Sequence, residues 1–408
     1  MLGAGIAFLT QLMVAKELEP TQYGAFAATL IKFSLVSTFS GSAASVFLIH
    51  IYSKEGDQAR RWLKGILKYL GLTQCLGIVL IITTSWLSDE NLSTKIAILA
   101  LIPHMFGQIT LDFIAVKNHM DADYNKIAIW SVFPAIIRLS LISLMASTPQ
   151  AHMKELIYVS LAFSLTGLIM LSVGWQRLKD LFQGKWDRKQ RSVLVDTHFH
   201  TSEPSNSRVI KAILPFGVAG TLYIVTNQGI ALATIYLLDA KAAGIFNAAM
   251  IVGAALQQMP MLLYQKYLLP KLHLWAHSDR PKLEKLHQNG KSILCLLGVT
   301  VSATAYWATP YLVPILLGNN YQESIFALQI LSLALPFKYM IVGASSIILA
   351  VDIKLKIQTL GAIALTSFIL LIALTRPFGL EGAATASLLS DIFALVLFSR
   401  VIKHLKHQ

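Results

Sequence analysis

The chain has 408 residues, of which 55% are hydrophobic and only 13% are charged, and its formal net charge is +13 at pH 7. Soluble domains carry about 25% charged residues, so this composition excludes an ordinary soluble protein. The basic residues lie between apolar runs, where they set membrane orientation, so the positive charge does not indicate a nucleic-acid partner. Cys75 and Cys295 lie inside apolar runs, and neither a disulfide framework nor a metal site is predicted.

Apolar runs of about 20 residues recur along the whole chain, and each is long enough to cross a hydrocarbon core about 30 Å thick. The runs are continuous and do not alternate, so they predict helices and not a closed barrel. We therefore expect an all-α integral membrane protein. Its twelve predicted spans are 1–15, 24–49, 65–87, 96–116, 127–147, 156–174, 212–237, 242–264, 292–317, 325–351, 357–375 and 382–399.

The loops between these spans differ strongly in charge. One alternating set carries most of the Lys and Arg residues, and the basic residues of the opposite set are Lys16, Lys95, Lys154, Lys241 and Arg376. Basic loops stay in the cytoplasm, so this asymmetry predicts that both termini are cytoplasmic.

The longest run without an apolar segment of membrane length is 175–211, which contains eight Lys or Arg residues. We interpret it as a cytoplasmic connector between two bundles. The predicted organisation is an N-terminal six-span bundle at 1–174, a basic connector at 175–211 and a C-terminal six-span bundle at 212–408.

A short motif occurs once in each predicted bundle. Residues 22–28 read Gln-Tyr-Gly-Ala-Phe-Ala-Ala, and residues 242–248 read Ala-Ala-Gly-Ile-Phe-Asn-Ala, so a Gly, a Phe and an Ala match at an offset of 220. Six spans return the chain to its starting side, which makes the halves parallel repeats. Two such halves usually enclose a central cavity near the membrane midplane and work by alternating access.

Three cations lie deep inside predicted spans: Lys32, Arg138 and Lys338. Charged groups at membrane depth are costly and normally face a partner or a wet cavity. We interpret the three as lining a cationic cavity for an anionic substrate, for which phosphate groups are the obvious candidates. The structural alternatives are buried ion pairs, Arg138 with Asp112 or Lys338 with Asp391, and snorkelling of Lys68 or Lys338 to an interface.

Further polar side chains inside the spans are candidates for ion or proton coupling or for lining the cavity. They are His104, Asp112, Asp391, Asn227, Gln228 and Gln257. His104 is either a proton-relay group or an ordinary packed imidazole.

The sequence contains no recognisable catalytic constellation. Gly290-Lys291-Ser292 looks like the end of a phosphate-binding loop, but the required first glycine is replaced by Lys285. We find no acid/base or nucleophile arrangement, so we expect neither an enzyme nor a cofactor.

Three passages resemble a known family: Leu18-Glu-Pro-Thr-Gln-Tyr-Gly-Ala-Phe26, the stretch from Ile213-Leu-Pro-Phe-Gly217 to Gly244-Ile-Phe-Asn-Ala-Ala249, and Pro377-Phe-Gly-Leu-Glu-Gly-Ala-Ala-Thr-Ala386. On these motifs the chain resembles the O-antigen and polysaccharide flippases of the multidrug/oligosaccharidyl-lipid/polysaccharide exporter superfamily, over nearly its whole length. The chain departs from the family at the seventh span, where relatives often carry an Asp and this chain reads Thr226-Asn-Gln-Gly-Ile230.

The resemblance implies transport of a polyprenyl-pyrophosphate-linked oligosaccharide from the cytoplasmic to the outer leaflet of a bacterial inner membrane. Arg138 and Lys32 would hold the anionic headgroup, with Lys338 assisting. Membrane lipids, and a polysaccharide polymerase and glycosyltransferases, are the implied partners. The alternatives are a multidrug or cation antiporter and a peptidoglycan-precursor lipid flippase of the same superfamily, and, from another class, a non-transporting membrane scaffold.

Overall fold

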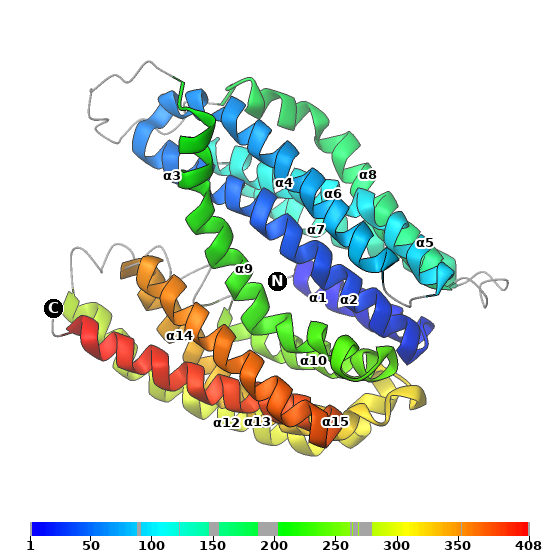
Figure 1. The fold of residues 1–408 in the computed structure, drawn as a ribbon. Helices are drawn as coiled ribbons and strands as arrows, with labels where there is room; N and C mark the ends of the chain where they lie inside the picture. The colour runs from blue at the N-terminus through cyan, green and yellow to red at the C-terminus, as the bar shows by residue number, and fades with distance from the viewer. Residues whose placement is uncertain are drawn as a thin grey trace. The chain divides into compact units, whose positions relative to one another are not determined.

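The computed structural model describes residues 2–87, 91–121, 123–146, 155–186, 203–261, 263, 268, 280–351 and 353–406. These residues form helices joined by short turns, and none of them forms a strand, so the predicted all-α class is confirmed (Figure 1). The longer helices are α1 (Leu2–Glu17), α2 (Pro20–Ser37), α3 (Ala43–Glu55), α4 (Arg60–Trp86), α5 (Leu92–Ala100), α6 (Ile102–Met120), α7 (Tyr124–Ala146), α8 (Glu155–Phe182), α9 (Asn206–Leu237), α10 (Ala240–Met261), α12 (Arg280–Leu316), α13 (Ser324–Leu333), α14 (Leu335–Val351) and α15 (Ile353–Lys406).

Among the described residues, eight helical stretches are long and apolar enough to cross a membrane, or nine if the bent pair α13–α14 is counted as one span. Three of these stretches are interrupted. Leu92–Met120 has 29 residues and contains a turn at Leu101 between α5 and α6. Pro20–Trp86 has 67 residues and contains the π-helical turn Thr38–Ser42 and a turn at Gly56, whereas Lys354–Lys403 has 50 residues and bends at Gly379. The chain is thus a multi-pass membrane protein. The described parts of the twelve predicted ranges are helical except at two ends, Leu87 and Leu317, and at two internal turns, Leu101 in 96–116 and Ala334 in 325–351. The count of twelve stays a prediction.

The bend in α15 has a local cause. Gly379 has φ 57 and ψ −132, which is outside the helical region, and two helical legs meet there. A residue without Cβ adopts positive φ at little cost. Pro377, two residues earlier, also removes a helical hydrogen-bond donor. The break lies between the last two predicted spans.

The described chain divides into two compact units by internal contacts. The N-terminal unit comprises Leu2–Thr10 and Thr29–Thr221, and the C-terminal unit comprises Gln11–Ala28 and Leu222–Gln408. Each unit therefore takes part of α1, α2 and α9. The sequence-based division, with bundles ending at 174 and beginning at 212, follows the basic connector and not the internal contacts of the fold. It stays a prediction.

The core of the N-terminal unit joins α3, α4, α6, α8 and the start of α9 at one end of the bundle. Aromatic residues dominate it: Phe47 packs on Trp62 with ring centroids 5.2 Å apart, and Phe113 packs on Phe182 at the same separation. This end corresponds to the predicted cytoplasmic side, because the basic segments 54–64 and 117–126, which belong to the Lys- and Arg-rich set of loops, and the described ends of the connector lie there.

One described end of the predicted connector contacts the turn between α3 and α4, and the other packs against α4 itself. Trp186 donates a hydrogen bond from Nε1 to Asp57 (2.8 Å) and lies under the Arg60 guanidinium, 5.1 Å from the ring centroid. Val209, near the start of α9, is fully buried in the same core. α8 and α9 thus extend beyond the predicted spans into 175–211, and residues 187–202 with Arg188, Lys189 and Arg191 lie outside the described part.

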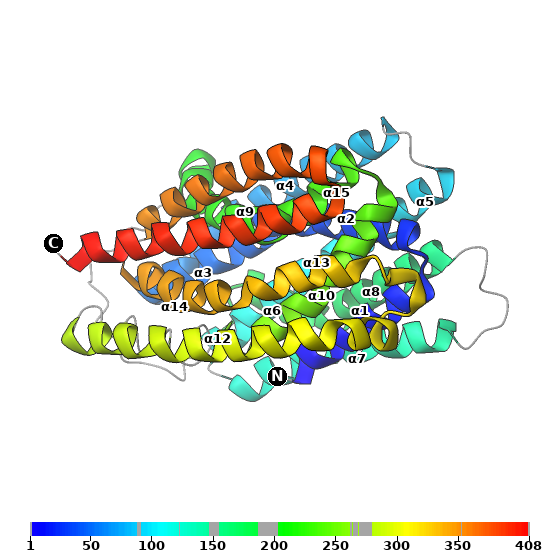
Figure 2. The same cartoon turned by 90° about the horizontal axis from the view of Figure 1, so that it is seen from below.

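In the C-terminal unit, α14 packs against both α12 and α15 (Figure 2). Tyr339 of α14 is buried with Leu294 and Ala305 of α12, and its hydroxyl donates a hydrogen bond of 2.7 Å to the backbone carbonyl of Leu256 on α10. Ile348, further along α14, is fully buried against α15. α14 therefore joins two apolar clusters of this unit.

In the same unit, α2 and α10 cross with their backbones in contact. A Cβ added at Gly24 would collide with the carbonyl oxygen of Ala240, and one added at Gly244 would collide with the carbonyl oxygen of Pro20. Pro20 precedes Gly24 by four residues, and Ala240 precedes Gly244 by four. The two copies of the sequence motif therefore meet each other in equivalent positions.

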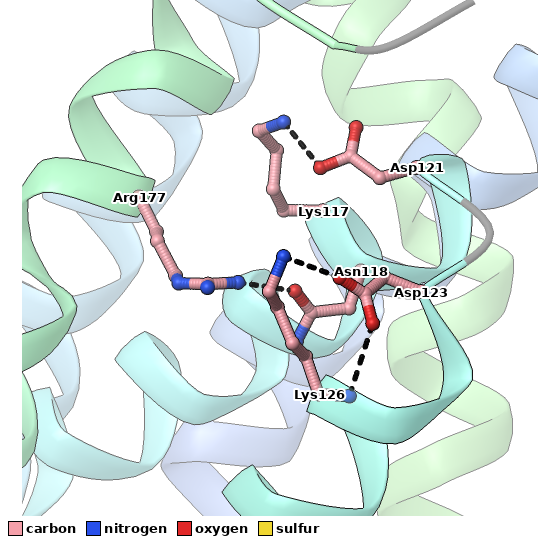
Figure 3. Close-up of polar contacts among 6 residues, drawn as sticks. All are labelled: Lys117, Asn118, Asp121, Asp123, Lys126 and Arg177. Atoms are coloured by element: carbon pink, nitrogen blue, oxygen red, sulfur yellow. Dashed lines mark hydrogen bonds and ion pairs between the residues drawn. The ribbon is translucent and has the colours of Figure 1, made fainter. Parts of the chain in front are cut away.

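A polar network closes the turn between α6 and α7 in the N-terminal unit (Figure 3). Arg177 of α8 donates from Nη1 to Oδ1 of Asn118, 2.6 Å away, and Lys117 pairs with Asp121 at 2.5 Å. On the exposed side of the turn, Lys126 pairs with Asp123. The Lys126 ammonium, through its hydrogen bond, lowers the pKa of the Asp123 carboxyl.

Replacing Arg177 by leucine should destabilise the protein by about 1–3 kcal/mol, because the fully buried Asn118 amide loses the partner of its oxygen. Among the described residues, the Asn118 Nδ2 atom already has no partner. The measurement is the midpoint of thermal unfolding of the solubilised full chain, with the exposed Lys179→Leu as the control. Equal midpoints for the two variants would contradict the expectation.

Candidate functional site

A cavity of about 300 Å³ lies inside the N-terminal unit, between α1, α6 and α7. This volume is at the lower end of the range for small-molecule pockets. The lining is mostly apolar, with a few polar groups from α6 and α7. The lining residues are Gly3, Ala7, Gln108, Leu111, Asp112, Ala115, Ile127, Trp130, Ser131, Pro134, Ala135 and Arg138.

Arg138 supplies the cation of this cavity. Its guanidinium carbon lies 4.3 Å from the ring centroid of Phe163 on α8, which is within the range of a cation–π contact. Its Nε is buried, and within the described chain this atom has no hydrogen-bond partner. The positive charge of Arg138 is therefore stabilised by the face of the Phe163 ring. Its Nε–H remains available to donate a hydrogen bond at the cavity wall. One turn earlier, Pro134 interrupts the hydrogen bonding of α7 and lines the same cavity.

Asp112 of α6 supplies a carboxylate to the lining, and Gln108 lies one turn before it on the same helix. Ser42 donates a hydrogen bond of 2.6 Å from Oγ to Oδ2 of Asp112. Ser42 ends the π-helical turn Thr38–Ser42, which shifts the register of the helix at this point. As far as the chain is described, Arg138 and Asp112 form no ion pair, so both signs of charge line one cavity without neutralising each other by contact.

His104 does not line this cavity. Its side chain is buried, its ring packs edge-on against Phe163 at 5.4 Å between centroids, and it hydrogen-bonds the Phe163 backbone carbonyl. Phe163 thus contacts both the imidazole and the Arg138 guanidinium. This geometry corresponds to the packed-imidazole alternative.

The other two predicted cations are elsewhere. Lys32 is half-buried on α2, and it is not a lining residue of this cavity. Lys338 of α14 forms an ion pair with Asp391 of α15, with Nζ 3.2 Å from Oδ2 and side chains 14% and 18% exposed. For Lys338 and Asp391, the structure therefore has the ion pair that was the alternative to cavity lining. Both residues belong to the C-terminal unit.

The predicted amides also lie outside the cavity lining. Asn227 donates from Nδ2 to the backbone carbonyl of Tyr223, one turn earlier on α9, at 2.8 Å. Gln228 is exposed on α9, and Gln257 is half-buried on α10. All three belong to the C-terminal unit. Of the polar candidates named from the sequence, the structure therefore brings together only Arg138 and Asp112, and Gln108 lines the cavity beside them.

Sequence reasoning missed two residues that position the charged groups. Ser42 lies in a run of small residues, Ser40–Ser45, which is a recognisable signal for close packing. Phe163 gives no signal, because one aromatic residue in an apolar span is ordinary. Its role depends on the approach of α7 to α8, which pattern alone does not give.

The chain is a multi-pass helical membrane protein with a cavity in its N-terminal unit that contains charged side chains. We compared it with known proteins of any class. No family model matches the chain, and no curated protein matches it in sequence.

Solved structures match in fold. A structure of the lipid II flippase MurJ in an inward closed conformation has a TM-score of 0.76 and 14% identity, covering 98% of this chain and 86% of that one. The MATE multidrug transporter DinF-BH has a TM-score of 0.68 and 15% identity, covering 99% and 93%. An inward-facing multidrug resistance MATE family transporter of the MOP superfamily has a TM-score of 0.64 and 14% identity, covering 100% and 96%. The chain has the fold shared by these transporters.

Proposed function

We propose that this protein is a flippase that moves a polyprenyl-pyrophosphate-linked oligosaccharide, an O-antigen or exopolysaccharide repeat unit, across the bacterial inner membrane by alternating access. The observation that carries the proposal is Arg138, a cation with an unpartnered buried Nε among the described residues, in the wall of a cavity. Its placement inside a fold shared with a lipid flippase and with drug transporters supports a transported substrate.

The chemistry of Arg138 favours a phosphate-bearing substrate. A guanidinium presents planar paired donors that match phosphate oxygens, and it stays charged under all physiological conditions. Keeping such a group at membrane depth is costly, and a purely structural arginine would be expected to pair with a carboxylate. Asp112 lines the same cavity and is hydrogen-bonded by Ser42 instead.

Asp112 also favours a second candidate, a multidrug or cation antiporter, because a carboxylate in the cavity suits a cationic substrate. A lipid flippase for a peptidoglycan precursor is a third candidate with a related substrate. Three measurements separate these candidates. Increased drug susceptibility of a pump-deficient host that lacks the protein would indicate the antiporter, and lethality on depletion would indicate the peptidoglycan-precursor flippase. Loss of surface polysaccharide alone would indicate the proposed flippase.

The direct test replaces Arg138 and Lys32 together by alanine. We expect export of surface polysaccharide to be abolished while the protein stays in the membrane at its normal level. Arg138→Ala alone should slow flipping in proteoliposomes about 10- to 100-fold, the worth of one charged hydrogen-bonding partner. Arg138→Lys should retain part of the activity, because it keeps the charge but loses the paired geometry.

Lys179→Ala, an exposed cation at the end of α8, is the matched control and should export normally. Full export by the Arg138/Lys32 double variant would reject the proposal. If Asp112→Asn abolished drug resistance in the pump-deficient host and left polysaccharide export intact, the antiporter would replace the flippase.

A further inference from the structure

The N-terminal unit has a second charged feature, where α4 crosses the start of α9. The helices approach closely because Gly65 has no side chain: a Cβ there would lie 2.5 Å from Cγ2 of Val209. Val209 is fully buried at this contact. The residues that flank the two contact positions therefore lie beside the same crossing.

Four of those flanking residues are cations. Lys64 and Lys68 are one turn apart on α4, and Arg208 and Lys211 are three residues apart on α9, so each pair shares a helix face. All four side chains are exposed. We call these four residues the cationic patch.

Little of this charge is neutralised locally. Glu203 lies 3.3 Å from Lys64, and both side chains of that pair are more than half exposed (69% and 63%), so the pair is weak. Arg208 lies over the Trp62 ring, 5.9 Å from its centroid. Glu55 also attracts Arg208, but its carboxylate is already paired with Arg61, with Oε1 2.6 Å from Nη2. Neither Lys68 nor Lys211 has an ion-pair partner in the described part of the chain.

The cationic patch stands at the end of two faces that are exposed and apolar. On α4, Leu72, Leu76 and Leu80 follow Lys68 at four-residue spacing and are 53%, 61% and 60% exposed. On α9, Ile210 and Leu214 are one turn apart on either side of Lys211 and are 38% and 41% exposed. In a membrane protein such faces contact acyl chains, so the cations lie at the level of the lipid headgroups.

Helix direction adds to the positive potential. α4 begins at Arg60 and α9 begins at Asn206, so both helices have their N-termini on this side. A helix N-terminus carries partial positive charge and attracts phosphate. Two N-termini, four cations and two lipid-facing faces thus converge on one crossing.

We propose that the cationic patch binds the phosphate headgroup of an anionic phospholipid in the leaflet on the predicted cytoplasmic side, with the acyl chains along the apolar faces of α4 and α9. Basic pockets between transmembrane helices on this side are suited to anionic headgroups. Cations that served orientation alone would need only to lie on the correct side. They would not need to gather beside a close helix crossing that has lipid-facing walls.

The test is native mass spectrometry of the full chain in detergent, with phosphatidylglycerol or phosphatidylcholine added. We expect the wild type to retain phosphatidylglycerol in preference to phosphatidylcholine. Lys68→Gln/Lys211→Gln should lose about tenfold or more in phosphatidylglycerol affinity, as each cation near a lipid surface contributes several-fold. Lys179→Gln/Lys185→Gln removes two exposed cations from the same side and should bind as the wild type does.

Equal retention of phosphatidylglycerol by the Lys68/Lys211 variant and the wild type would overturn the assignment, as would equal binding of the two lipids by the wild type. Displacement of the lipid by millimolar inorganic phosphate would identify a site for soluble anions and would also overturn it. The inference does not rest on the transported substrate. Arg138→Ala should bind phosphatidylglycerol normally, so failure of the flippase proposal is distinguishable from failure of this one.

Discussion

Replacing Lys338 by methionine should destabilise the protein by about 3–5 kcal/mol, the usual cost of removing one partner from a buried ion pair. Lys338 and Asp391 lie 3.2 Å apart and are both mostly buried, so the variant leaves a carboxylate buried without its counter-charge. Methionine has a similar length and shape, so lost packing contributes little. The measurement is the midpoint of thermal unfolding of the solubilised full chain, taken as the temperature at which half of its monodisperse fraction is lost.

The double variant Lys338→Met/Asp391→Asn is the control for this interpretation. It removes both charges, and replacing a buried ion pair by neutral groups is often close to neutral for stability. We therefore expect the double variant to be more stable than Lys338→Met alone, which is a coupling that only an interacting pair produces. Additive effects of the two substitutions would contradict the ion pair.

The helical membrane fold could be predicted from the sequence because it depends on a local property. A continuous apolar run must satisfy its backbone hydrogen bonds internally, and only a helix does this within one segment. The residues at which the helices end were harder to predict from the sequence. α8 continues to Phe182 and α9 begins at Asn206, because a helix that leaves the hydrocarbon extends into water with Lys and Arg on its surface, and apolarity no longer marks it.

The candidate site could be predicted only in part, for a physical reason. Arg138 and Asp112 were identifiable because a charge inside an apolar run is costly and therefore informative. Which charges pair depends on distances across the fold. The sequence left both pairings open, and the structure has Lys338 with Asp391 but does not pair Arg138 with Asp112. The cation–π contact between Arg138 and the Phe163 ring could not be predicted from the sequence pattern.

The repeated motif gives the last prediction, because its two glycines face each other across a helix crossing in the C-terminal unit. Gly24→Ala and Gly244→Ala should each destabilise the protein by about 1–3 kcal/mol, the usual cost of overpacking. Each added methyl would meet a backbone carbonyl, that of Ala240 or Pro20, and backbone cannot rotate away as a side chain can. α2 and α10 must therefore move apart. Leucine at either position should cost more, and we expect little folded protein in the membrane.

The same geometry predicts how the two substitutions combine. Once one methyl has separated α2 from α10, the second enters space that is already open, so Gly24→Ala/Gly244→Ala should cost less than the sum of the single variants. Gly253→Ala is the matched control on α10, since a Cβ there would meet nothing within 4 Å. Alanine in place of an unconstrained helical glycine should leave stability unchanged or raise it by up to about 1 kcal/mol. If Gly244→Ala behaved as Gly253→Ala does, the two motifs would not be in backbone contact, and their match in sequence would lose its structural explanation.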